Sequence, residues 1–148
     1  MLDSLKKLFA EKKEDQSTIG QRDADLASVA LMILVSNADH QVDPVEVARI
    51  LDIAKETCDL NGSDVKEFFS EAELRTEASV SLYEFTEVIN ASLEKSAKYE
   101  LVKNLWRVAY ADSKLDRYED STIRKVAELI YVSHSDFIKA KHSVSEEV

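Results

Sequence analysis

The segment ADHQVDPVE, from Ala38 to Glu46, returns later in the chain as ADSKLDRYE, from Ala111 to Glu119. An alanine, two aspartates and a glutamate recur at identical spacing in the two segments. Each segment follows an apolar stretch and precedes a second one. Self-similarity of this kind predicts two copies of one supersecondary unit, in which an acidic turn joins two helices.

The repeat extends on both sides of the acidic turns into two halves, at about 22–70 and 95–142. No segment shows the sustained two-residue alternation that is typical of a strand, whereas apolar residues recur at helical spacing. Two glycines and one proline in 148 residues also favour helices over turns. We therefore expect an all-α fold, a single helical bundle of about seven or eight helices with an internal pseudo-two-fold repeat. The polar stretch Glu71–Ser79 is expected to be a connector.

Three segments divide the chain. Residues 1–17 are predicted to form an N-terminal amphipathic helix, residues 18–142 the helical domain, and residues 143–148 a frayed tail. The apolar stripe of the first segment comprises Leu2, Leu5, Leu8 and Phe9. Acidic residues accompany its lysines, so docking on the core, or on a second chain as a homodimer, is favoured over peripheral membrane association.

The composition limits the classes of protein. A net charge of −10 argues against nucleic-acid binding, which needs a clustered cationic surface. The longest apolar run, Val29–Val35, is too short to cross a bilayer, and the N-terminal residues lack a secretory signal. Cys58 is the single cysteine and is expected to be a small buried residue rather than a nucleophile. These features predict a cytoplasmic protein with no transmembrane segment.

Short polar residues that can cap a helix mark several helix starts. Asp43 and Asp116 are favoured N-caps, and Glu46 and Glu119 stand where a capping box places its acidic member. The same pattern predicts further caps at Asn61, Ser81 and Ser133. Four of the repeated carboxylates can therefore be explained by helix capping alone.

Asp39 and Asp112 are different, because each follows an apolar helix whose C-terminal dipole disfavours negative charge by about 0.3–1 kcal/mol. A bound cation would relieve this conflict, and clustered oxygen ligands suit Ca²⁺ or Mg²⁺. The spacing does not match an EF-hand loop. The candidate metal ligands are Asp39, Asp43 and Glu46 in the first turn, and Asp112, Asp116 and Glu119 in the second. Zinc is not favoured, because the first turn's His40 is replaced by Ser113 in the second.

The pattern A-D-x-x-[VL]-D-x-x-E after an apolar helix, given twice, resembles the tellurite-resistance TerB-like family. The second half, LWRVAYADSKLDRYEDSTIRKVAELIYVSHSDFIKAK, is the closer match, and the resemblance covers roughly residues 20–142. A glycine often follows the first aspartate in that family, whereas His40 and Ser113 stand there in this chain. The resemblance implies an all-helical fold, acidic clusters suspected of binding metal, and association with stress responses, often near the membrane. It implies no catalytic activity.

Two functions stay open at this stage. One is a non-enzymatic stress-response module that binds a divalent cation and engages protein partners. The other is a metal-free helical scaffold or adaptor whose acidic residues only cap helices. An enzyme is disfavoured, because the chain has neither a phosphate-binding loop nor a nucleophile–base pair at a recognisable spacing.

Overall fold

Every regular element in the described part of the chain is a helix. The computed structural model describes residues 20–38, 43–78, 81–112 and 114–147. Within these ranges residues 20–36 are helical and no residue is in a strand, which confirms the all-α prediction. The further helices are α2 Pro44–Thr57, α3 Gly62–Ala78, α4 Tyr83–Ser92, α5 Lys95–Ala109, α6 Arg117–Leu129 and α7 His134–Ser145. The predicted N-terminal helix at 1–17 lies outside the described residues.

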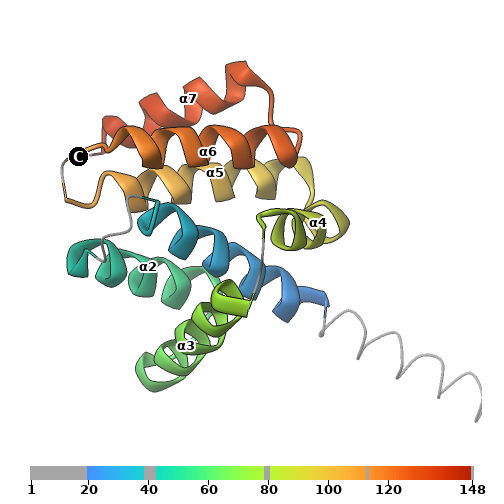
Figure 1. Ribbon diagram of the computed structural model, residues 1–148, viewed down its shortest axis with the longest axis vertical. Coiled ribbons are helices and arrows are strands. Elements are labelled where there is room, and N and C mark those ends of the chain that lie inside the picture. The colour runs from blue at the N-terminus through green and yellow to red at the C-terminus, as the bar shows by residue number, and fades with distance from the viewer. Residues whose placement is uncertain (1–19, 39–42, 79–80, 113, 148) are drawn as a thin grey trace, which may run out of the picture.

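The helix of residues 20–36 occupies the middle of the bundle. Its side chains are apolar on most faces, and Leu26, Leu31 and Val35 are fully buried. A helix that is apolar on most faces has to be surrounded by other helices. Figure 1 shows this arrangement, with α2 and α3 on one side of the 20–36 helix and α4 and α5 on the other.

Helix α5 is the second element of the core. It packs against α2, α6 and α7. Its apolar residues recur at helical spacing, and Leu101, Leu105 and Trp106 among them are buried. The Trp106 ring lies 5.2 Å from the Phe137 ring of α7, centroid to centroid, so an aromatic pair joins these two helices.

Several helices begin at the residues that the sequence predicted. The carboxylates of Asp43 and Asp116 accept hydrogen bonds from the backbone N–H groups of Val45 and Tyr118. The Ser133 hydroxyl accepts a bond from the N–H of Asp136 in the same way. Each bond satisfies a backbone donor that the first helical turn leaves open.

The prediction of a connector at Glu71–Ser79 is wrong. Helix α3 continues to Ala78, and Ala72 is completely buried within it. Glu71 also forms an ion pair with Arg22 of the 20–36 helix. The periodicity is hard to see in the sequence because only one small residue of this stretch reaches the core.

Two smaller predictions also differ from the structure. Ser81 is not the N-cap of α4, because α4 begins at Tyr83 and its N-cap is Leu82. The Ser81 hydroxyl still accepts a 3.3 Å hydrogen bond from the Tyr83 N–H. The tail was predicted to fray from residue 143, yet α7 extends to Ser145 with Val144 buried. Two 3.0 Å hydrogen bonds then join the Arg107 guanidinium to the Glu147 carboxylate, so the chain stays attached to α5 beyond α7.

Helices α2 and α6 end in the same way. Each is followed by a residue with positive φ, Asp59 at 52° and Tyr131 at 63°. The next N–H, of Leu60 or Val132, then bonds back to a carbonyl of the last turn. This is the Schellman arrangement, in which a left-handed residue closes the helix. The match agrees with the predicted repeat, while the internal two-fold itself stays a prediction.

Within the described residues, no helix has both the length and the apolar character that crossing a bilayer requires.

A proline in the second part of α3 tests its helical state. Glu73 is exposed, and Glu73→Pro is expected to lower the free energy of unfolding by about 3 kcal/mol, because proline lacks the N–H that a helix interior needs. Glu73→Ala, the control, should change it by less than about 0.5 kcal/mol. Urea unfolding followed by circular dichroism measures both. An open connector would tolerate the proline as well as the alanine.

Candidate functional site

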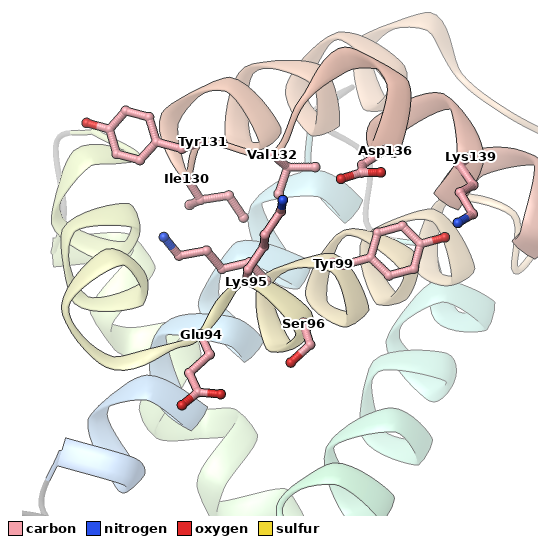
Figure 2. Close-up of a pocket in the computed structure, with 10 residues that line it drawn as sticks. Glu94, Lys95, Ser96, Tyr99, Ile130, Tyr131, Val132, Asp136 and Lys139 are labelled. Atoms are coloured by element: carbon pink, nitrogen blue, oxygen red, sulfur yellow. The ribbon is translucent and has the colours of Figure 1, made fainter.

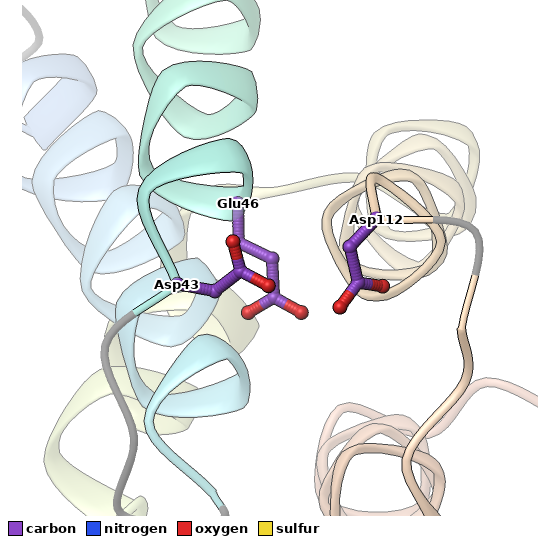
Figure 3. A group of neighbouring side chains, drawn as sticks. All are labelled: Asp43, Glu46 and Asp112. Carbon is purple, nitrogen blue, oxygen red and sulfur yellow. The ribbon is translucent and has the colours of Figure 1, made fainter.

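Packing of α2 against α5 brings the two acidic turns together. Asp43 and Glu46 stand at the start of α2, and Asp112 follows the end of α5. The three residues offer carboxylate oxygens that lie within 4.8 Å of one another, and we call them the acidic cluster. Figure 3 shows the carboxylates of Asp43 and Glu46 facing that of Asp112 across the gap between the two helices.

Asp43 and Asp112 each use one carboxylate oxygen to hold the local backbone. Asp43 Oδ1 accepts a 2.9 Å bond from the Val45 N–H at the start of α2. Asp112 Oδ1 accepts a 3.0 Å bond from the Lys114 N–H within the turn after α5. These bonds fix the direction of both side chains, and they leave lone pairs on both carboxylates for a further ligand.

Glu46 is the most deeply buried member of the cluster, with 2% of its surface exposed. Its Oε2 accepts a 2.7 Å hydrogen bond from the Ser36 hydroxyl at the end of the 20–36 helix. Its carboxyl group is also hydrogen-bonded to that of Glu119, which is 3% exposed at the start of α6. Two carboxyl groups can form such a bond only if one of them carries a proton.

Burial raises the pKa of Glu46 above its ordinary value. The hydrogen bonds from Ser36 and Glu119 oppose this rise, whereas the negative charges of Asp112 and Asp43 add to it. In the described part of the chain, no lysine or arginine forms an ion pair with the three carboxylates of the cluster. Two like charges at this separation repel by roughly 1–3 kcal/mol, so a proton or a cation in the cluster would stabilise it.

The structure groups the predicted site residues differently from the sequence. The sequence grouped three carboxylates within each turn, whereas the structure joins two from the first turn to Asp112 of the second. Asp116 caps α6, and Glu119 contacts the cluster through Glu46. Asp39 and His40 lie outside the described residues. Sequence reasoning missed Ser36, because a serine in an apolar helix gives no signal of its partner.

Metal coordination is compatible with the size of the cluster. Oxygens that bind one Ca²⁺ ion at about 2.3–2.6 Å can be up to about 5 Å apart, and the cluster satisfies this limit without rearrangement. Mg²⁺ binds at about 2.0–2.1 Å and therefore requires oxygens no more than about 4.2 Å apart. Three carboxylates are also the hard oxygen donors that these two ions prefer.

Cys58 gives no support for a nucleophilic site. It follows α2 as its C-cap and is half-buried. Burial raises the pKa of its thiol to about 11, so the thiol is protonated at neutral pH. This agrees with the expectation of a structural rather than a reactive cysteine.

Comparison with known proteins gives one match. A family model described as "Tellurite resistance protein TerB" matches residues 25–142. This span contains both acidic turns and all the described members of the cluster. No curated protein and no solved structure matches the chain.

The raised pKa of Glu46 predicts a dependence of stability on pH. The folded protein retains this proton at pH values where the unfolded chain has lost it, so wild-type stability should fall as pH rises from about 4.5 toward the raised pKa. Glu46→Gln cannot ionise and should lack this part of the decline. We expect the variant to gain stability relative to the wild type between pH 4 and 8 in urea unfolding of the metal-free proteins. The prediction would be contradicted if the free energies of unfolding of the two proteins changed with pH in parallel.

Proposed function

Because the chain belongs to the TerB family of tellurite resistance proteins, we propose that it is a non-enzymatic module that binds a divalent cation and engages protein partners in a stress response. The acidic cluster of Asp43, Glu46 and Asp112 is the proposed cation site. Ca²⁺ is the first choice, because its coordination distances suit the cluster as it stands.

One observation carries this proposal. Carboxylates from two turns that are far apart in the sequence converge within 4.8 Å, and no cationic side chain of the described residues is paired with them. Helix capping explains why an aspartate begins α2 and α6, but it does not explain why Asp112 is placed against Asp43 and Glu46. A shared cation gives this arrangement a function, because it would join α2 to α5.

The sequence repeat suggests a second cation. The counterparts of Asp43, Glu46 and Asp112 in the repeat are Asp116, Glu119 and Asp39. Asp39 lies outside the described residues, so the second set rests on the sequence alone. If both sets bind, the protein takes up two cations, and each cation uses carboxylates from both halves.

A metal-free helical scaffold is the second candidate function. The observation that favours it is the pair of caps at Asp43 and Asp116, each of which accepts a backbone hydrogen bond at the start of a helix. A proton shared between Glu46 and Glu119 would then replace the cation as the group that lowers repulsion. In this case the protein acts only through its surfaces.

Exposed apolar side chains beside the acidic turns are the proposed contact surface for a protein partner. Val45 and Tyr118 occupy equivalent positions in the repeat, two residues after the capping aspartates, and both side chains are more than half exposed. These two side chains are therefore the apolar groups that a partner at the acidic turns would contact. A cation that fixes the two turns would also fix these side chains.

A thermal melt of the metal-stripped protein distinguishes the two functions. Ca²⁺ at 100 times its dissociation constant is expected to add about 2.7 kcal/mol of stability and to raise Tm by roughly 5–10 °C. The double variant Asp43→Asn/Asp112→Asn should lose the part of this shift that the acidic cluster contributes. Asparagine retains the capping oxygen, so helix α2 still begins normally and the loss reports the missing charges.

The matched control removes two carboxylates elsewhere. Glu87 on α4 and Glu128 on α6 are exposed, and Glu87→Gln/Glu128→Gln should keep the full Ca²⁺ shift. Asp39→Asn tests the second set, and it should halve the number of ions bound in a calorimetric titration. No shift with millimolar Ca²⁺ or Mg²⁺ in the wild type would favour the metal-free scaffold.

A further inference from the structure

A cavity lies away from the acidic cluster, where the first turns of α5 and α7 meet the end of α6. Its volume is about 630 Å³, within the range of pockets that hold small molecules. Buried Ile130 and half-buried Val132 supply apolar walls, and Tyr99 and Tyr131 add two phenol rings. Figure 2 shows these rings on opposite sides of the cavity.

Lysines dominate the charge of this cavity. Lys95, Lys98 and Lys139 line it together with Glu94 and Asp136, which gives it an excess of one positive charge on a chain of net charge −10. Figure 2 shows the Glu94 carboxylate directed away from α7. Glu94 is the N-cap residue of α5 and makes no side-chain bond to the first turn of that helix, so its charge is not used to cap the helix.

Tyr131 is an unusual residue for its position. It closes α6 in the left-handed conformation, φ 63°, where a bulky side chain is disfavoured and glycine or asparagine is common. The residue is 81% exposed, and the centroid of its ring lies 5.7 Å from Lys98 Nζ. The equivalent residue after α2 is Asp59, which is better suited to this conformation. Folding alone therefore does not account for a tyrosine at the rim of the cavity.

From these observations we propose that the cavity binds a small phosphorylated compound with an aromatic ring, such as a nucleoside diphosphate. The lysine ammonium groups would contact the phosphates, and the exposed Tyr131 ring would stack on the flat ring of the ligand. Lysine is a common phosphate ligand in proteins and binds it as a point charge. A single cavity of this kind suits a small molecule, whereas a nucleic-acid chain would need a longer cationic surface.

ADP is the first probe, titrated calorimetrically in EDTA so that the result does not depend on the acidic cluster. We expect saturable binding of one ADP per chain, with a dissociation constant below about 1 mM. Adenosine and inorganic phosphate, each alone, should bind at least about tenfold more weakly, because each provides half of the contacts. Absence of saturation at about 5 mM ADP overturns the proposal, as does equal binding of adenosine.

Variants of the lysines and of Tyr131 test the contribution of each to ADP binding. Lys98→Gln/Lys139→Gln should weaken ADP binding at least about tenfold, whereas Lys66→Gln/Lys125→Gln, which removes two exposed lysines outside the cavity, should leave it unchanged. Tyr131→Gly should weaken binding at least about fivefold while the protein stays folded, because glycine suits the left-handed position. Tyr131→Asn provides the same test with a side chain. Equal weakening by the two lysine pairs, or unchanged binding by both Tyr131 variants, would refute the proposal.

Discussion

The hydrogen-bonded carboxyl groups of Glu46 and Glu119 place a polar contact where helices from both halves of the chain meet. Glu46 also accepts the Ser36 hydroxyl, so one buried carboxyl group connects the 20–36 helix, α2 and α6. A buried carboxyl is costly unless it is bonded or protonated, and this one is bonded twice. Because the contact is satisfied only when three helices are placed correctly, it contributes to the choice of one arrangement of the bundle. It also places Asp43 and Asp112 beside Glu46, whose carboxyl group is either protonated or negatively charged. A bound cation would favour the charged form.

The helices themselves could be predicted from the sequence to a large extent. Apolar spacing predicts the two central helices, and Asp43 followed by Pro44 gives the start of α2. These signals are local, because caps and amphipathic faces depend on residues within one or two turns. The second part of α3 was missed for the same reason. Its tertiary contacts are the buried Ala72 and an exposed ion pair of Glu71 with Arg22, and neither feature produces a strong periodic signal.

The acidic residues could be recognised in the sequence, but their grouping could not. Spacing along the chain suggests that Asp112 acts with Asp116 and Glu119, its neighbours in the turn. In the structure it approaches Asp43 and Glu46, because α5 packs against α2. The capping-box pattern likewise predicts a local role for Glu46, whereas its carboxyl group is buried against Ser36. Packing between helices decides both outcomes, and a single sequence does not record it.

The two proposed sites lie at opposite ends of helix α5 and are related by its dipole. Its first turn lines the lysine cavity, and its last turn leads into Asp112 of the acidic cluster. A helix of 15 residues is about 22 Å long and carries partial positive charge at its start and partial negative charge at its end. The dipole therefore favours an anion at the cavity and a cation at the cluster. An anion and a cation at opposite ends would both stabilise the same buried helix, which packs against α2, α6 and α7. Because both ligands would bind the folded protein at the ends of α5, each would add to its stability against unfolding.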